Sequence, residues 1–336
     1  MPARRVAILL TLTLVAAFLV VLRVTLDRPA AGSGGWVVLA WPESPSVLEL
    51  RTMRVVAAVI VGVALAVSGT ILQCLLRNPL AAPDLIGVSP AASLAVVLVS
   101  TFAGGSAGMA AGGGLGVLGW QAGPALVGAM AGLGLVYALS QRRGWVDPVS
   151  MVLVGVIVGV LCGAAVVAIQ AVLPNAALGG VRVLIGAISD DHSAATLAAT
   201  GIAALVVVLG TARFGPALDA MSLGDDEAAS VGVAVRGLRL AMFVGAGVLA
   251  ACAVVLAGPL GFVGLIAPHA ARLLCGPAHR TLVIGAAVCG ACLVLAGDCI
   301  VRIVDTPGGR LPLGVVMAAA GGPVIILLLR RHPMRE

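Results

Sequence analysis

The sequence predicts an all-α integral membrane protein with about ten membrane-spanning helices. Hydrophobic residues make up 61% of the 336 residues, charged residues make up 10%, and the mean hydropathy is +1.16. Soluble domains are about 45–50% apolar and about 25% charged, so this composition excludes a water-soluble fold. Polar turns also divide the chain into apolar runs of about 20 residues, the length at which a helix crosses a bilayer.

The most informative of these turns is the segment 77–84, which reads Arg-Asn-Pro-Leu-Ala-Ala-Pro-Asp. Uncharged runs lie on both sides of it, at residues 57–76 and 85–118. A Pro-rich turn leaves backbone groups that lipid cannot satisfy. The chain must therefore leave the hydrocarbon at this point and then re-enter it.

The first five expected spans are residues 6–24, 55–75, 85–102, 121–140 and 149–173. The first span follows Arg4 and Arg5, as in a signal peptide. It is long for a signal peptide and no clear small-x-small cleavage site follows it, which favours a spanning helix. The second and third spans flank the Pro-rich turn. A Gly-rich stretch, 104–119, then forms an outer loop and, having no Lys, is not a phosphate-binding motif.

The last five expected spans are residues 194–211, 238–257, 262–274, 282–303 and 313–329. Arginines stand near the ends of these runs, as is typical of residues at a membrane boundary. The boundary arginines are Arg213, Arg236, Arg272, Arg280 and Arg330. The eighth span, 262–274, is short.

The distribution of charge predicts the orientation of the chain. An even number of spans places both termini on one side of the membrane, and most of the arginines fall on that side. Positively charged loops stay on the cytoplasmic side, so we expect both termini in the cytoplasm. The whole chain, residues 1–336, is expected to be one transmembrane domain.

The longest cytoplasmic connection covers about residues 214–236. Gly224 divides it into two short helical stretches. Asp225 is a good N-cap for the second stretch, and the carboxylates of Asp226 and Glu227 suit the positive end of a helix dipole. Two short helices at a membrane surface form a compact knob suited to docking into another protein. The alternative interpretation is a solvated linker.

Other residue patterns exclude several functions. The arginines lie at span ends rather than in a basic patch interleaved with aromatic residues, which argues against nucleic-acid binding. Cys289 and Cys292 form a C-x-x-C inside an apolar run without charged partners, so we interpret them as packing residues. The lone His269 is interpreted in the same way. No metal site, cofactor or catalytic residue is expected.

Asp298 is an ionisable residue in the ninth span, and such residues are functional candidates by default. Arg302 lies one turn further on, so an intrahelical ion pair is preferred to a proton relay. An ion-coupled secondary transporter would need several buried carboxylates, and Asp298 is a single one. An intramembrane enzyme would need a clustered nucleophile and base, which the four His residues do not provide.

Five stretches carry a family resemblance. They are residues 54–73, ending in Ser68-Gly69-x-x-x-Gln73; 77–87, beginning Arg77-Asn78-Pro79; 223–232; 258–272, containing Pro268-His269 and Arg272; and 311–323, containing Gly314. In this order they resemble the FecCD-type permeases of bacterial ATP-binding-cassette (ABC) importers. The resemblance extends from the first span to the last.

The resemblance implies a cobalamin-permease-like subunit in the inner (cytoplasmic) membrane, paired with a second permease that is identical or paralogous. Two cytoplasmic ATPase subunits would drive transport, and an extracytoplasmic binding protein would deliver the substrate. The chain has no G-x-x-x-x-G-K-[ST] motif, which fits ATP hydrolysis in separate subunits. The implied cargo is a ferric siderophore, favoured by the Asp225-Asp226 and Pro83-Asp84 forms. Cobalamin and haem are the alternatives.

The resemblance also implies roles for individual residues. The segment that couples to the ATPase comprises Leu223, Gly224, Asp225, Asp226 and Glu227. Arginines would dock the binding protein, because their planar fork binds carboxylates bidentately. The matching positions are Arg51, Arg54 and Arg302. The common Arg-Leu-Pro-Arg is Arg51-Thr52-Met53-Arg54 here, and simple anchoring at span ends is the alternative role.

The cytoplasmic gate would lie between the fourth and fifth spans, at Asp147, Pro148 and Val149, where some relatives have small hydroxyl residues. The fifth and tenth spans would border the pathway, which includes Gly155, Gly159 and Gly314. A wall of small apolar residues has no strong ligands. It suits a conduit that must release a bulky chelate.

Overall fold

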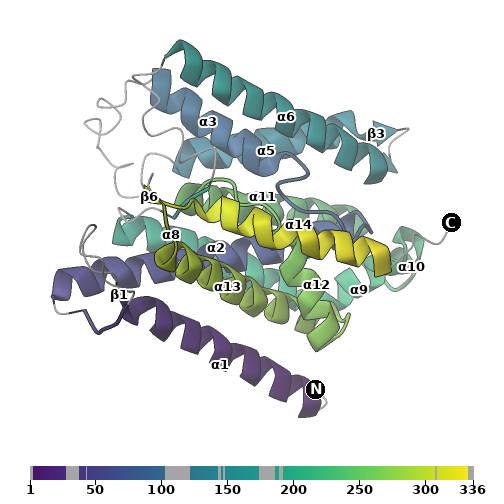
Figure 1. The fold of residues 1–336 in the computed structure, drawn as a ribbon. Coiled ribbons are helices and arrows are strands. Elements are labelled where there is room, and N and C mark those ends of the chain that lie inside the picture. Colours follow the sequence, from purple (N-terminus) through teal and green to yellow (C-terminus); the bar gives the residue numbers. More distant parts are fainter. Residues whose placement is uncertain are drawn as a thin grey trace.

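The fold is that of a computed structural model, in which residues 3–27, 38–42, 44–102, 122–142, 145–146, 148–173, 186–188, 192–306 and 309–331 are described. The described part is a bundle of roughly aligned helices (Figure 1). Short connections and three two-stranded antiparallel pairs join them. The prediction of an all-α membrane protein is confirmed.

Ten longer helices correspond in order to the ten predicted spans. They are α1 (Ala3–Thr25), α2 (Pro45–Leu75), α3 (Val88–Phe102), α5 (Ala122–Leu139), α6 (Pro148–Val172), α8 (Ala194–Arg213), α11 (Val235–Ala257), α12 (Val263–Cys275), α13 (His279–Ile303) and α14 (Leu313–Arg331). Among the described residues, six of these helices are long and apolar enough to cross a membrane, and the other four contain shorter apolar segments.

The largest difference from the prediction is at the start of α2, which begins at Pro45 instead of residue 55. The Ser44 side chain accepts a hydrogen bond from the Val47 backbone N–H at 3.3 Å, and Pro45 suits the first helical turn. With 31 residues the helix is about 46 Å long, whereas the hydrocarbon core is about 30 Å thick. A prediction based on apolar runs misses the outer turns of this helix, because those turns are polar.

The remaining elements are short. Helices α9 (Gly215–Leu223) and α10 (Asp225–Ser230) lie between α8 and α11. Strands β1 (Leu26–Asp27) and β2 (Val38–Leu39) pair after α1, β3 (Gln141–Arg142) and β4 (Trp145–Val146) pair before α6, and β5 (Asp305–Thr306) and β6 (Gly309–Arg310) pair after α13. The two predicted helical stretches divided at Gly224 are thus present.

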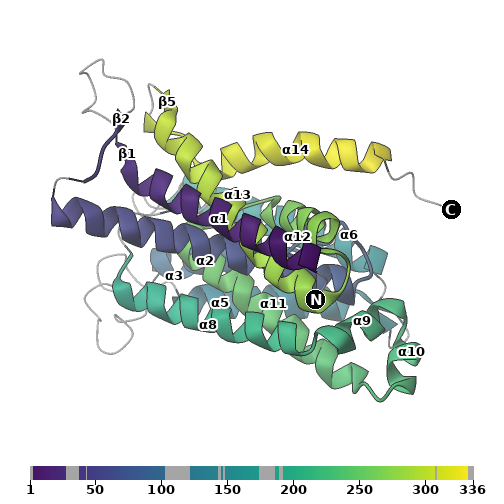
Figure 2. The same cartoon turned by 90° about the horizontal axis from the view of Figure 1, so that it is seen from below.

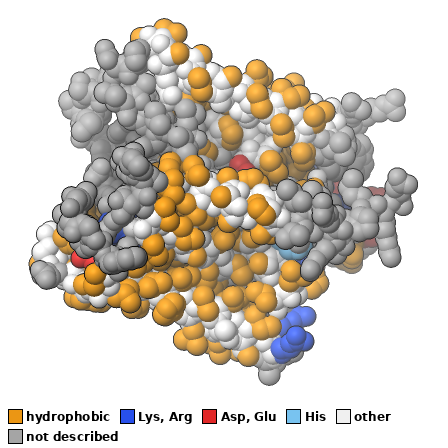
Figure 3. All heavy atoms as spheres, viewed as in Figure 1, with side chains coloured by type: hydrophobic (Ala, Val, Ile, Leu, Met, Phe, Trp, Pro, Cys, Tyr) orange, Lys and Arg blue, Asp and Glu red, His pale blue; other side chains and the backbone are white. Residues whose placement is uncertain are grey.

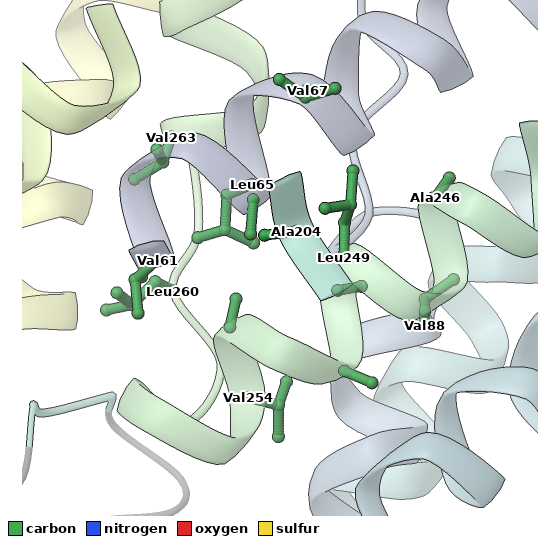
Figure 4. Packing of buried hydrophobic residues seen from close by; sticks show 14 of the residues in the cluster. Val61, Leu65, Val67, Val88, Ala204, Ala246, Leu249, Val254, Leu260 and Val263 are labelled. Carbon is green, nitrogen blue, oxygen red and sulfur yellow. The ribbon is translucent and has the colours of Figure 1, made fainter. Parts of the chain in front are cut away.

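Helix α2 lies inside the bundle and packs closely on α13 and α12. A Cβ atom at Gly62 would overlap the carbonyl oxygen of Gly290, and one at Gly69 would overlap that of Gly264. These glycines therefore allow backbone-to-backbone contact, which is the main packing device between helices in lipid. Side chains of α2, α3, α8 and α11 fill the neighbouring core, among them Leu65 and Leu249 (Figure 4).

The two ends of the bundle are chemically different from its sides. Both chain termini lie at the same end as α9 and α10, and the strands β1 and β5 lie at the opposite end (Figures 1 and 2). On the face shown in Figure 3, most of the described side chains between the two ends are apolar. With termini assigned to the cytoplasm, α9 and α10 mark the inner end, and β1 and β5 mark the outer end.

Candidate functional site

The outer end holds a buried cluster of ionised side chains from three helices. Arg54 of α2 donates from Nη2 to Oδ1 of Asp298 in α13 at 2.7 Å, and from Nε to both carboxylate oxygens at 3.0 and 3.1 Å. Arg23 of α1 donates from Nε to Oδ2 of the same carboxylate. Asp298 is fully buried and both arginines are nearly so. This cluster joins α1, α2 and α13.

A second, more exposed cluster lies close by. Asp27 accepts from Arg51 Nη2 and, at 3.4 Å, from Arg302 Nη2. Arg51 also donates from Nη1 to the carbonyl oxygen of Val24 at 2.8 Å. The side chain of Asp27 is 40% exposed, whereas those of Arg51 and Arg302 are 10% and 17% exposed.

The expected pair within one helix, Asp298 with Arg302, is wrong. Asp298 is directed into the bundle, where Arg23 and Arg54 meet it, and Arg302 is directed to Asp27. A fully buried carboxylate needs strong partners, and two arginines from neighbouring helices supply more hydrogen bonds than one residue on its own helix. Arg23 lies near the end of the first apolar run, and this position was the signal that could have identified it as a partner of Asp298.

The predicted docking residues therefore lie together at the outer end, but not in the same setting. Arg54 is buried against Asp298, and Arg51 and Arg302 share Asp27 near the surface. Among the described residues of the two clusters, four arginines face two aspartates, so arginines outnumber carboxylates there. Such a site attracts carboxylates.

At the inner end, Asp225 holds α10 against the bundle. Its Oδ1 accepts from Arg77, at the end of α2, and both of its oxygens accept from Arg239 Nη2 in α11 at 2.7 Å. The prediction of Asp225 as an N-cap is wrong: Gly224 is the cap residue without a side-chain bond, and Asp225 is the first helical residue. Its carboxylate is used for the two arginines instead.

The outward face of this segment consists of other residues. Leu223 is 77% exposed, and Asp226 and Glu227 are also exposed. A cavity of about 410 Å³ lies beside them, between the end of α2, α10 and the start of α11. Its lining comprises Leu75, Leu76, Arg77, Leu223, Gly224, Asp225, Asp226, Glu227, Arg239 and Phe243. The segment thus divides into an anchor, Asp225, and a surface with an apolar tip and acidic sides.

The predicted motif turns connect helices rather than forming a separate site. Arg77 has a left-handed backbone (φ 47°) and donates from Nε to the carbonyl oxygen of Met221 in α9 at 3.2 Å. Asn78 accepts from the backbone N–H of Leu80, within the turn that also holds Pro79. Arg272 donates to Gln73 Oε1 at 3.2 Å, and so joins α12 to α2. In the same helix Pro268 is buried and His269 is half-buried.

The residues predicted to border the pathway make close contacts with other parts of this chain. A Cβ at Gly155 would approach the backbone of Ile86 at 2.6 Å, and one at Gly159 would lie 3.6 Å from Pro90. Gly155 therefore lets α6 pack against the backbone just before α3, whereas the space at Gly159 would accept a Cβ at ordinary contact distance. The N–H of Gly314 donates to the carbonyl oxygen of Gly186 at 3.0 Å.

Of the gate positions, Asp147 lies outside the described residues. Helix α6 begins at Pro148, and the side chains of Pro148 and Val149 also lie outside what is described.

Asp84, in the connection between α2 and α3, is a site that the sequence did not reveal. Its Oδ1 is buried, and no described residue donates to it. Burial raises the pKa of the carboxyl group to about 6, against the opposing effect of backbone hydrogen bonds, including one from Phe262. The neighbouring Gly87 contacts α6, and Phe262 contacts Gly321 of α14. Asp84 thus lies next to two residues, Gly87 and Phe262, one of which contacts α6 and the other α14.

Cysteines and histidines form no separate site in the described part of the chain. All seven cysteines are free thiols. The described residues contain no group of three or more His, Cys, Asp or Glu residues that could hold a metal ion.

Charged clusters at both ends and an apolar bundle between them are the arrangement of a membrane-spanning protein. The comparison with known families gives the same class and a family. Residues 6–331 match the model of the FecCD transport family. The chain belongs to this family, and is therefore a permease of an ABC importer of iron chelates, haem or cobalamin. Such a permease works with ATPase and binding-protein partners.

Relatives with different cargoes are equally similar to the chain. It is 34% identical over 291 residues to the hemin transport system permease protein HmuU of Yersinia pestis, covering 86% of this chain and 84% of that protein. It is 34% identical over 295 residues to the ferric enterobactin permease FepG of Escherichia coli, covering 86% and 84%. The vitamin B12 permease BtuC of Vibrio cholerae is 34% identical over 301 residues, covering 87% and 86%.

A solved structure has the same fold. It is an inward-facing conformation of a metal-chelate type ABC transporter, with a TM-score of 0.78 and 24% identity, covering 98% of this chain and all of that one. This likeness confirms the predicted cobalamin-permease-like architecture at the level of the fold.

Proposed function

We propose that the chain forms the translocation pathway for a ferric siderophore. The Asp225-Asp226 and Pro83-Asp84 forms support this cargo. The 34% identity to the ferric enterobactin permease is compatible with it but does not separate it from the hemin and vitamin B12 permeases, which have the same identity. Cobalamin and haem are the alternatives within the same class. A secondary transporter driven by an ion gradient has less support, because Asp298, the one buried carboxylate within a spanning helix among the described residues, is paired with two arginines.

Competition among cargoes tests this assignment. Cells that depend on this permease should take up radiolabelled ferric siderophore, and excess unlabelled siderophore should abolish the uptake. Excess cyanocobalamin or hemin should have no effect. Uptake of labelled cobalamin with no uptake of any ferric siderophore would replace the proposed cargo by the alternative.

Helix α10 and the end of α9 form the segment that seats in a groove of the ATPase. This role is supported by a difference between the residues of the segment, one of which is bound to the bundle while the others are exposed. Asp225 is held by Arg77 and Arg239, while Leu223, Asp226 and Glu227 remain exposed. A rigidly held knob with an apolar tip and acidic sides fits a groove that has an apolar floor and basic rims.

A charge reversal at Glu227 tests the role of the knob. Glu227→Arg should weaken co-purification of the ATPase at least tenfold, since it places a cation against the basic rims. Arg213→Glu, in the last turn of α8, is a control of the opposite sign outside this segment. Equal ATPase recovery from Glu227→Arg and wild-type protein would contradict the assignment.

The outer clusters form the docking site for the binding protein. Arg51, Arg54 and Arg302 provide positive charge there, with Arg54 supporting the site from its buried position. Asp27 already occupies Arg51 and Arg302, so an incoming carboxylate must compete with it. The excess of arginines over carboxylates among the described residues of the clusters favours that competition.

Three substitutions, two expected to weaken and one expected to strengthen the affinity for the binding protein, test the docking site. Arg51→Glu and Arg302→Glu should each weaken binding of the binding protein about tenfold or more in low salt. Asp27→Asn should strengthen it, because the competing carboxylate charge is removed. Unchanged affinity in all three variants would remove these residues from the docking site.

A second permease completes the pathway, and α6 and α14 border it. Exposed apolar side chains on α6 support this proposal, because they lie opposite the glycine face that packs on α3. The exposed residues include Leu153, Val156, Ile157, Val160 and Leu161. The gate stays assigned to Asp147, Pro148 and Val149 at the inner end of α6.

A further inference from the structure

The two sites at opposite ends of the molecule are connected by α13. We propose that Asp219 joins the ATPase-coupling segment to α13, and that this joint passes the state of the ATPase to the docking site. The inference rests on the proposed function of α9 and α10. It adds a positioning residue, Asp219, that lies outside the surface proposed to contact the ATPase.

The joint is a helix cap supplied by another helix. Oδ1 of Asp219 in α9 accepts from the backbone N–H of His279 at 2.8 Å, and lies 2.6 Å from Nδ1 of the same residue. His279 is the first residue of α13, and its own cap residue, Ala278, has no side-chain bond. Asp219 therefore satisfies a free N–H at the positive end of α13.

A second contact makes the joint stiff. A Cβ at Gly215, the first residue of α9, would lie 2.7 Å from the backbone nitrogen of Arg280 and 2.9 Å from its Cα. The backbones of α9 and α13 thus touch at Gly215, one helical turn before Asp219. Two points of attachment on one short helix restrict rotation of α9 relative to α13.

Helix α13 can carry a displacement over the whole membrane. It runs without a proline from His279 to Ile303, a length of about 37 Å for 25 residues. Its last two turns hold Asp298 and Arg302, which are members of the two outer clusters. Gly290, near its middle, is in backbone contact with Gly62 of α2. A shift of α9 therefore moves both outer clusters together with α2.

The contact of Asp219 with α13 is expected to contribute little to the stability of the fold. The Asp219 side chain is 42% exposed, so this cap contributes only modestly to stability. Loss of the side chain should leave the protein folded. An effect on communication between the sites can then be separated from loss of structure.

The test uses the complete transporter, reconstituted in lipid nanodiscs with its ATPase and its binding protein. The measured quantity is the ratio of ATPase activity with and without the binding protein. Asp219→Ala should lower this ratio at least fivefold, with unchanged basal activity and ATPase recovery. Asp219→Asn keeps a hydrogen-bond acceptor for the N–H of His279, and should retain more of the ratio. Arg213→Ala, an exposed position in the last turn of α8, is the control.

The outcomes distinguish the joint from the coupling role itself. An unchanged ratio in Asp219→Ala, with the ATPase still bound, would overturn the joint and leave the proposed coupling segment intact. Loss of ATPase binding in Asp219→Ala would make Asp219 part of the docking surface, and would overturn its role as a positioning residue. Failure of the wild-type chain to bind an ATPase would overturn the proposed coupling function and the joint with it.

Discussion

The buried cluster of Arg23, Arg54 and Asp298 makes a sharp prediction about stability. Asp298→Asn keeps the shape of the side chain and removes its charge, so both guanidinium groups lose the carboxylate charge of Asp298. Arg23→Met instead removes one of two cations and leaves the pair of Arg54 and Asp298 neutral. The first change should be severely destabilising, and the second should cost little.

The magnitudes follow from the burial and the charge count. Asp298 is 0% exposed, and Arg23 and Arg54 are 3% and 7% exposed. Removing one partner of a buried ion pair costs about 3–5 kcal/mol. Native proteins are stable by only about 5–15 kcal/mol, so this is a large fraction of the total. In Arg23→Met the thioether side chain fills most of the space of the arginine stem, and the loss should stay below about 1 kcal/mol.

Thermal unfolding in detergent, followed by the loss of the monodisperse peak in size-exclusion chromatography, measures both effects. A loss of 3–5 kcal/mol corresponds to a fall of about 10 °C in the midpoint. The order of the variants matters more than the absolute values. A midpoint for Asp298→Asn within about 2 °C of wild type, or an equally large loss in Arg23→Met, would refute the reasoning.

Two other substitutions test packing and burial. Gly62→Val should destabilise the protein by about 3 kcal/mol or more, because its side chain would overlap the backbone of α13. Gly134→Val, where nothing lies within 4 Å of a Cβ, should change stability by less than about 0.5 kcal/mol, because Val forms helices slightly better than Gly. Equal midpoints for the two would contradict the close approach. Burial raises the pKa of Asp84 from 3.8 to about 6, so its folded form prefers the proton and stability falls as the pH rises from about 4 to 6. Asp84→Asn should remove this dependence and raise the midpoint at pH 7.5 by the equivalent of about 3 kcal/mol. A pH profile unchanged by the substitution would exclude Asp84 as its source.

The sequence by itself determined the membrane architecture. Each span depends on a local rule, since about 20 apolar residues cross the bilayer and a polar turn cannot remain in it. All ten predicted spans are therefore helices, and the break at Gly224 separates two short ones. Five sequence stretches in the family's order were also sufficient to identify the family. The start of α2 was missed because its outer turns are polar and extend beyond the hydrocarbon.

Only the tertiary structure decided which charged residues meet. Asp298 has a partner candidate one turn away, yet it pairs with arginines 275 and 244 positions distant. Asp225 was expected to cap a helix, and instead it binds two arginines. Helix periodicity places a side chain on a face, but it contains no information about which helix covers that face. In a low-dielectric interior the pairing of charges depends on that non-local choice.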